Sequence, residues 1–424
     1  GATLSASKVS GVQAVSWQTG SIKTATFTAT AGEGYFCNTS GGAFTVNLPA
    51  GSAGAVVAVS DYTRTFQTNN LTISPNGSEK IGGVAADTTL STEGQSATFV
   101  YVDGTEGWIN VQETSNSVTG RSFITATGGT ITTCGNFKIH TFTGPGTFCV
   151  SSISTVAAEN TVGYLVVAGG GAGGRSYGGG GGAGGYREGR NVPIDNFTAS
   201  PLVANSPTNA ITLTATAFPI TVGAGGAGVG TGEDAGGTGA ASSFSTISSA
   251  GGGGGASEAG TPSPKAAKTG GSGGGGGYNP APSGGAGGAG NTPPVSPPQG
   301  NNGGTGYDFT SSGASGGGGG GASGNGSDAQ PTNGGGPGAN GVASSITGSP
   351  VTRAGGGGGG SGPNTPGTFG NGGSGGGTPG RKGGSQPTTD AGTANTGGGS
   401  GGGSCSGSSG NGGSGVVIIR YKFQ

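Results

Sequence analysis

Histidine is almost absent from this sequence, and methionine is absent altogether. The single histidine, His140, excludes metal sites built from several imidazoles, and no two cysteines have the CxxC spacing of a zinc site. The acidic residues are scattered, with no pair that suggests glycoside hydrolysis. We therefore expect no enzyme, no catalytic residue, no cofactor and no metal, and we interpret His140 as an exposed strand residue opposite Phe137 and Ile139.

Charge is also scarce, at 8% of the residues, with 16 basic side chains against 17 acidic ones. A nucleic-acid groove needs clustered lysine and arginine, so nucleic acid is excluded as a partner. No apolar run approaches the roughly 18–20 residues that span a bilayer, and we expect no membrane insertion. Signals of α-helix are lacking too, because no capped stretch of about ten residues has a 3.6-residue period.

Glycine is what the chain has in excess, with 110 of 424 residues, and its distribution divides the chain. Residues 1–118 resemble ordinary β protein, with short alternating runs between Gly, Asn, Asp and Ser turns. In "AFTVNLP", for example, Phe44, Val46 and Leu48 share one face. The pattern predicts a small antiparallel β module, which would join the chain to the rest of a larger assembly.

Residues 119–167 predict a second β region. "FKIHTF", a "TGPG" turn and "TFCVSS" are read as a hairpin. "YLVVA" (164–168) is apolar on both faces, as a central strand would be, and "VVII" (416–419) near the chain end has the same character. We expect these two runs to pair and to close residues 168–424 into one domain at its base.

Residues 168–424 contain repeated glycine runs, among them "AGGGGGGSG" at 354–362. Their spacing is irregular and has no Gly-X-Y period, which excludes solenoids and collagen. Glycine has no side chain to bury, so an ordered state must be held by backbone hydrogen bonds. The left-handed helix with three residues per turn points these groups outward, and six glycines would make a rod of about 19 Å. We therefore predict an all-β fold with a bundle of packed polyglycine II helices; the alternative is a disordered glycine-rich tail.

Large side chains are few in this region and lie beside the glycine runs. Loops on a rigid scaffold often carry recognition, and aromatic rings can stack on sugars. The candidate receptor-binding residues are Tyr278, Tyr307, Phe309, Phe369, Lys265, Lys268, Arg353, Arg381 and Lys382. The alternative is that the rings cover the flanks of the bundle and that the cations are solvated surface charges.

Four cysteines are too few for a disulfide scaffold in a chain of this length. Cys134 and Cys149 are the best candidate pair, because they fall in neighbouring strand-like runs. A reduced pair is the alternative, since sequence does not give the distance between the two residues.

Several motifs resemble known families. "ATAGEGYFCNTSGGAFTVNLPAG" and "ATFVYVDGTEGWINV" resemble a β module common in tail-fibre proteins of marine bacteriophages. "VGYLVVAGGGAGG", "GGAGGYREG" and "GGSGVVIIRYKF" resemble the glycine-rich domain of phage tail and appendage proteins. Cys134 and Cys149 depart from that pattern, which favours a local disulfide between them.

The resemblance implies a virion tail fibre or distal tip protein, extracellular and often trimeric, that mediates adsorption to the host. Its partners would be a host cell-surface glycan or outer-membrane protein and other virion or fibre proteins. One alternative is a purely structural virion component or self-assembling filament subunit. An ice-binding protein is a minor alternative, because no regular Thr-x-Thr array presents a flat repeating face.

Overall fold

The computed structural model describes residues 15–114, 122–230, 235–258, 265–278, 284–309, 313–331, 334–364, 367–383, 388–405 and 407–424. The chain forms two units, Gly1–Arg121 and Ser122–Phe423, with the terminal Gln424 grouped with the first. This division lies a few residues after position 118, where the composition of the sequence changes. The strands of the region 119–167 belong to the sheets of the second unit, of which this region was expected to form the base.

The first unit is a sandwich of two sheets around an apolar core that includes Val46, Phe66, Leu71, Phe99 and Trp108. One sheet has the order β1-β3-β5-β8-β9 and the other β2-β4-β6-β7. Side chains in β4 and β6 alternate between buried and half-buried, as the sequence pattern predicted. The strands are β1 (Ser16–Trp17), β2 (Phe27–Thr28), β3 (Glu33–Cys37), β4 (Phe44–Asn47), β5 (Val56–Asp61), β6 (Leu71–Ser74), β7 (Thr88–Leu90), β8 (Ser96–Asp103) and β9 (Gly107–Thr114).

The expectation of a purely antiparallel module is wrong. The strands β1, β3 and β5 pair in parallel, and so do β2, β4 and β6. The reason is the path of the chain, which alternates between the two sheets from β1 to β6, so that strands two apart become neighbours with the same direction. The antiparallel pairs are β6–β7 and β8–β9, where the chain stays in one sheet, and β5–β8, where it returns to the first sheet.

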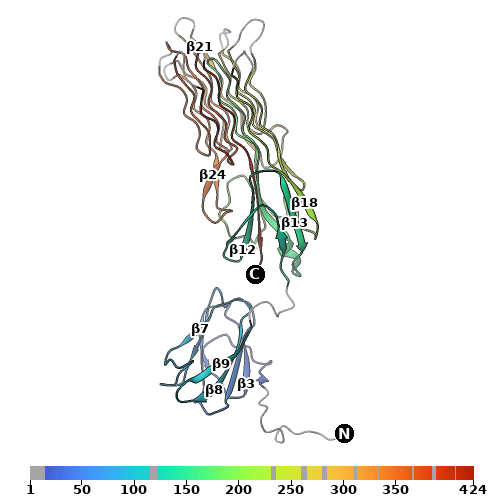
Figure 1. The fold of residues 1–424 in the computed structure, drawn as a ribbon, viewed down its shortest axis with the longest axis vertical. Helices are drawn as coiled ribbons and strands as arrows, with labels where there is room; N and C mark the ends of the chain where they lie inside the picture. The colour runs from blue at the N-terminus through green and yellow to red at the C-terminus, as the bar shows by residue number, and fades with distance from the viewer. Residues whose placement is uncertain are drawn as a thin grey trace. The chain divides into compact units, whose positions relative to one another are not determined.

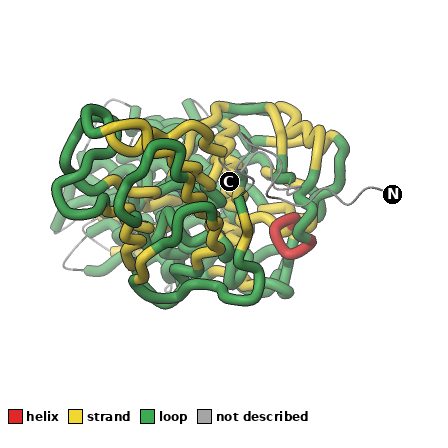
Figure 2. The backbone as a smooth tube through the Cα atoms, turned by 90° about the horizontal axis from the view of Figure 1, so that it is seen from below, coloured by secondary structure: helices red, strands yellow, loops and turns green. Residues whose placement is uncertain are grey.

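The second unit has two sheets at its base, where its apolar side chains gather. Their orders are β11-β12-β25-β14-β15-β16, with β17 on β14, and β10-β13-β18-β19-β20. Among the described residues the one helix is the 3₁₀ helix η3 (Ala157–Asn160), red in Figure 2. The strands are β10 (Thr125–Thr127), β11 (Thr130–Cys134), β12 (Phe137–Phe142), β13 (Gly146–Ser152), β14 (Thr161–Val167), β15 (Tyr186–Arg190), β16 (Val203–Asn205), β17 (Ile211–Thr212), β18 (Ala217–Thr221), β19 (Ser242–Phe244), β20 (Ile247–Ser249) and β25 (Val416–Lys422). Two further hairpins are β21 (Tyr307–Phe309) with β22 (Gly313–Ser315) and β23 (Val342–Ser344) with β24 (Val351–Arg353).

The predicted closure of the domain is confirmed. Strand β14 pairs antiparallel with β25, with Val167 opposite Val416 and Tyr164 opposite Ile419. Both strands are central in their sheet and buried on both faces, which explains why neither sequence alternates. The first and last segments of the glycine-rich region thus start from neighbouring strands.

The predicted hairpin between residues 137–142 and 147–152 is wrong. Strand β12 pairs instead with β11 through a two-residue turn, with Cys134 opposite Phe137. Gly135 in that turn has φ +55°, a conformation that glycine adopts without strain. The "TGPG" segment carries the chain from the sheet of β12 to the sheet of β13.

The prediction that His140 is exposed is also wrong. Its side chain is fully buried, packed edge-on to Phe148 at 4.9 Å. Its Nδ1 lies 2.7 Å from the carbonyl oxygen of Gly128, and its Nε2 lies 3.0 Å from the hydroxyl of Tyr421. Since the carbonyl can only accept, Nδ1 donates to it and Nε2 accepts from Tyr421 in the neutral imidazole. Burial lowers the pKa of His140 from its ordinary value.

Beyond the sheets, the glycine runs form rods that lie side by side, drawn in Figure 1 as wavy lines rising from β13 and β18 towards β21. Successive amides of one rod bond to different neighbours. Three consecutive donor–acceptor pairs, at N···O distances of 2.8–3.0 Å, are Gly180 with Gly317, Gly181 with Ser400, and Gly182 with Gly253. The partner rod recurs every third residue, because the amides of Gly178, Gly181 and Gly184 donate to Gly403, Ser400 and Gly397. This three-residue period is that of the polyglycine II helix.

The rod 355–360, inside the run "AGGGGGGSG", is surrounded by hydrogen-bonded neighbours. Its amides and carbonyls bond to backbone groups of six other segments. These lie at 178–181, 316–319, 336–339, 370–373, 375–378 and 399–402. Almost every backbone group of the rod is therefore satisfied within the bundle, without solvent and without side chains.

Glycine is required in this rod by the close approach of its neighbours. A Cβ atom added to Gly357 would lie closer than 3.0 Å to the carbonyl oxygen of Ser400, and one added to Gly358 would meet that of Gly370 equally closely. Because these obstacles are backbone atoms, they cannot move aside as a flexible side chain would.

At the flanks of the bundle, where a rod lacks a neighbour, Asn and Asp side chains take the place of that neighbour. The Oδ1 of Asn302 accepts the amide of Gly290 at 2.8 Å, and that of Asn340 accepts the amide of Ser374 at 2.9 Å. Asp328 likewise accepts the amide of Thr305. These side chains satisfy donors that would otherwise face solvent or another chain.

Candidate functional site

We call the end of the bundle that carries β21 and the turn Arg175–Tyr177 the apex (Figure 1). Ser176 and Tyr177 both have positive φ, +46° and +53°, which is uncommon for residues with a side chain. The turn is held by Cys405, whose carbonyl accepts the Ser176 hydroxyl at 2.8 Å. The hydroxyl of Tyr177 lies 2.8 Å from the Sγ of Cys405. The apex is therefore tied together by segments far apart in the sequence.

The predicted residues Tyr278 and Lys265 lie together at the apex. They line a hollow of about 120 Å³ whose other walls are glycine, alanine and serine. The ring of Tyr278 meets that of Tyr177 edge-on at a centroid distance of 5.9 Å. Burial raises the pKa of both tyrosines, so both phenols are neutral at physiological pH and can donate a hydrogen bond.

Two further predicted aromatics lie on one strand. Tyr307 and Phe309 belong to β21, which pairs with β22 at the apex. Tyr307 is half-buried. The side chain of Phe309 lies outside the described residues, so the prediction for Phe309 is tested only as far as its backbone.

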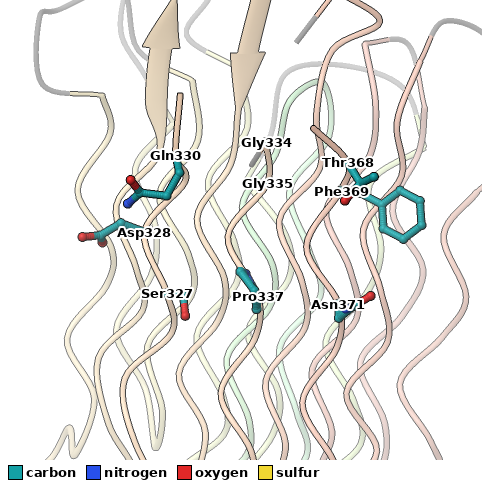
Figure 3. Close-up of a pocket in the computed structure, with 9 residues that line it drawn as sticks. All are labelled: Ser327, Asp328, Gln330, Gly334, Gly335, Pro337, Thr368, Phe369 and Asn371. Carbon is teal, nitrogen blue, oxygen red and sulfur yellow. The ribbon is translucent and has the colours of Figure 1, made fainter. Parts of the chain in front are cut away.

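Phe369 lines a hollow of about 420 Å³ in the bundle. We call this hollow the groove. Its floor and walls come from three adjacent rods (Figure 3). Gly334, Gly335 and Pro337 form the floor; Ser327, Asp328 and Gln330 form one wall; Thr368, Phe369 and Asn371 form the other.

Sequence analysis identified Phe369 but none of the polar groove residues. Asp328, Gln330 and Asn371 are exposed and lie between glycine runs. Other polar residues in such positions form turns, so these three did not stand out in the sequence. The sequence signal for these residues is the segment "SDAQ" (327–330), which is followed by the glycines 334–336. Polar side chains next to a rod of glycines indicate a hollow beside that rod.

The remaining loop cations are less well placed for recognition. Lys268 is exposed, and its amide bonds to Gly254 within the bundle. Arg381 forms an ion pair with Asp390 at 3.3 Å. Lys382 donates to the carbonyl of Gly367. These three cations can therefore be explained as ordinary surface charges at least as well as by contact with a receptor.

The prediction that Arg353 is a surface loop cation is wrong. Its side chain is buried at the base of the bundle, where β24 ends. Burial lowers the pKa of Arg353, and the nearby Glu188 carboxylate acts in the opposite direction. Glu188 is itself buried and accepts hydrogen bonds from Ser344 and the amide of Ser200. Arg353 therefore balances a buried negative charge in the fold.

The suggested disulfide is absent, since Cys134 and Cys149 are both free thiols. Cys134 ends β11 in one sheet, and Cys149 lies in β13 in the other. The proximity suggested by the sequence depended on the predicted hairpin, which does not form.

Within the described ranges, no three His, Cys, Asp or Glu side chains gather in a way that could hold a metal ion. The same ranges contain no helix long and apolar enough to cross a membrane. The side chains that line the hollows at the apex and the groove include aromatic rings, amides, hydroxyls, one carboxylate and one ammonium group.

A family model described as a glycine-rich domain matches residues 141–422. The match begins in β12 and ends in β25, so it contains both closing strands and every rod between them. No curated protein matches the chain in sequence.

Proposed function

This chain belongs to the family of glycine-rich domains, and from that premise we propose that it is a bacteriophage tail-fibre or distal tip protein that attaches the particle to the host cell surface. The observation that carries the proposal is the apex. There, the rod bundle brings together Tyr177, Tyr278 and Lys265 beside the ends of its rods. The host partner would be a cell-surface glycan or an outer-membrane protein.

The architecture supports display of a binding surface. In each rod, every third amide donates a hydrogen bond to the same neighbouring rod, which leaves little freedom for the bundle to deform. Residues on a rigid support lose less entropy when they bind, because they are held in place beforehand. Connections between rods can also vary in sequence without changing the hydrogen bonds that join the rods to one another.

The flanks support attachment in preference to the structural alternative. A filament subunit that packs through its rods needs unpaired backbone donors at the flank. Here such donors already have a partner within the chain, because they donate hydrogen bonds to the side chains of Asn302, Asn340 and Asp328. Edges that are occupied in this way oppose growth by addition of further chains.

The proposal is tested with the fluorescently labelled full chain on a panel of marine bacterial isolates. A double variant, Tyr278→Ser with Lys265→Ser, changes the apex. The control is Tyr62→Ser, which removes an exposed aromatic residue from the first unit. We expect the parent and the control to bind at least one isolate and the double variant to bind it at least ten-fold more weakly. Equal binding by all three proteins would exclude the apex as the attachment surface.

A further inference from the structure

The groove exists because its middle rod has no bulky side chains facing outward. The rod 334–338 bonds on one side to the rod 368–371, through the amides of Gly335 and Gly338. On the other side its Pro337 carbonyl accepts the amide of Ser327 at 3.0 Å. The two outer rods carry the larger side chains, and Pro337 is the one middle-rod residue with a side chain among those that line the hollow, so a trough of about 420 Å³ runs between the outer rods (Figure 3).

The two walls differ in chemistry. In Figure 3 the ring of Phe369 stands on one side of Gly334, Gly335 and Pro337, and Asp328 and Gln330 stand on the other. Thr368 and Asn371 add a hydroxyl and an amide on the side of Phe369. One wall thus offers an apolar face with polar groups around it, and the other offers acceptors and an amide donor.

We propose that this groove is a saccharide site that holds a neutral pyranose of a cell-surface glycan, an inference that rests on the proposed attachment function. A pyranose has an apolar face of C–H groups and an edge of hydroxyls. The C–H face packs against Phe369, and the hydroxyls donate to Asp328 and exchange hydrogen bonds with Gln330 and Asn371. The volume of about 420 Å³ lies in the range of small-ligand pockets.

The charge of the groove selects a neutral sugar over an acidic one. Asp328 is the one charged residue among the nine that line it. A carboxylate without a lining cation repels sialic or uronic acids, whereas it accepts hydrogen bonds from neutral hydroxyls. Asp328 is also held in place, because its Oδ1 accepts the amide of Thr305 at 2.6 Å.

The experiment measures saturation-transfer NMR and glycan-array binding of the full chain. The probes are oligosaccharides ending in glucose, galactose, mannose or N-acetylglucosamine, with sialylated forms of the same chains for comparison. The variants are Phe369→Ala, which removes the stacking face, and Asp328→Asn, which keeps the bond to Thr305 and removes the charge. Tyr62→Ala, an exposed aromatic outside the second unit, is the matched control.

We expect a neutral probe to bind the parent and the control. Phe369→Ala should weaken it about ten-fold, in line with the energy of an aromatic contact. Asp328→Asn should reduce the preference for neutral over sialylated probes. Unchanged binding by folded Phe369→Ala, preference of the parent for sialylated probes, or binding of no probe at millimolar concentration would each overturn the site.

Binding to cells, measured in parallel, separates this inference from the attachment function. If the parent binds cells while no neutral probe binds, the groove proposal fails and attachment stands. If a neutral probe binds through Phe369 while no cell is bound, the saccharide site stands and attachment fails. Circular dichroism of each variant shows that a loss of binding is not a loss of fold.

Discussion

The amide of Gly357 donates a hydrogen bond to the carbonyl of Gly181, 2.9 Å away, although the two residues lie in distant glycine runs. The carbonyl of Gly357 in turn accepts the amide of Gly319 from a third run. A glycine-rich segment that would be flexible on its own is here an interior rod. Its stability depends on contacts that a single methyl group would disrupt.

The interior of the bundle should not tolerate a side chain. Gly357→Ala places a Cβ against the carbonyl oxygen of Ser400, and overpacking of this kind costs about 1–3 kcal/mol. Gly324→Ala is the control, because a Cβ at that position meets nothing within 4 Å. Its effect should stay within about 0.5 kcal/mol. Urea denaturation of the three proteins measures the difference, and equal midpoints would contradict close packing of the rods.

The imidazole of His140 should titrate below 6.5, its ordinary pKa, because burial disfavours the charged ring. Since the pKa is lower in the folded state than in the unfolded one, the contribution of His140 to stability is fully present above pH 6.5. It is lost as the pH falls through the folded-state pKa. His140 is the only histidine, so one NMR resonance reports its titration. A pKa at or above 6.5 would contradict its buried position.

Arg353 should act on stability and not on binding. Arg353→Met leaves the buried Glu188 without its nearby positive charge, which should lower the free energy of unfolding within the range of about 0.5–3 kcal/mol usual for one substitution. At temperatures where the variant is folded, its binding to cells should equal that of the parent. Thermal denaturation and the cell-binding assay measure the two effects. Lost binding in a variant of normal stability would restore Arg353 as a receptor contact.

The thiols should react in the order of their exposure. Cys149 is exposed, whereas Cys37 is buried and burial raises its pKa to about 12. Under native conditions a maleimide should therefore modify Cys149 first and Cys37 last, as peptide mapping by mass spectrometry would show. Cys149→Ser should remove the first modification. Resistance of both Cys134 and Cys149 until a reductant is added would indicate the disulfide that the structure lacks.

The flanking side chains should keep the bundle from associating laterally. Replacing Asn302 and Asn340 by Ala frees the amides of Gly290 and Ser374. Unpaired donors at an edge favour pairing with another chain. Sedimentation velocity should show more self-association in the double variant than in the parent at equal concentration. A matched pair of substitutions, Thr388→Ala with Ser349→Ala, changes exposed polar residues and should leave sedimentation unchanged.

The parts of the fold that the sequence predicted depend on local composition. Tyr164–Ala168 and Val416–Ile419 are apolar on both faces, which only a central strand accommodates, and the glycine runs leave backbone bonding as the one source of order. His140 was misplaced because its partner, Tyr421, lies near the other end of the chain. The alternating pattern of side chains in β12 suggested that one face of the strand is exposed to solvent, but the second sheet of the unit covers that face.

The groove shows the same limit. Phe369 stands out in the sequence as a large side chain beside a glycine run, so it could be named as a candidate from the sequence alone. Asp328 lies far from Phe369 along the chain, and both line the groove only because the rod 334–338 lies between the two rods that carry them. Which rods become neighbours depends on the whole path of the chain through the bundle, and short motifs do not contain that information.

The three-residue repeat of partners also restricts how such a protein can change in evolution. An insertion of one residue in a rod would turn every later amide by a third of a turn, from its own acceptor towards that of another rod. An insertion of three residues would restore the direction of every donor and lengthen the rod by one turn. Rods of this family should therefore gain and lose residues in threes, while the connections at the apex accept any length.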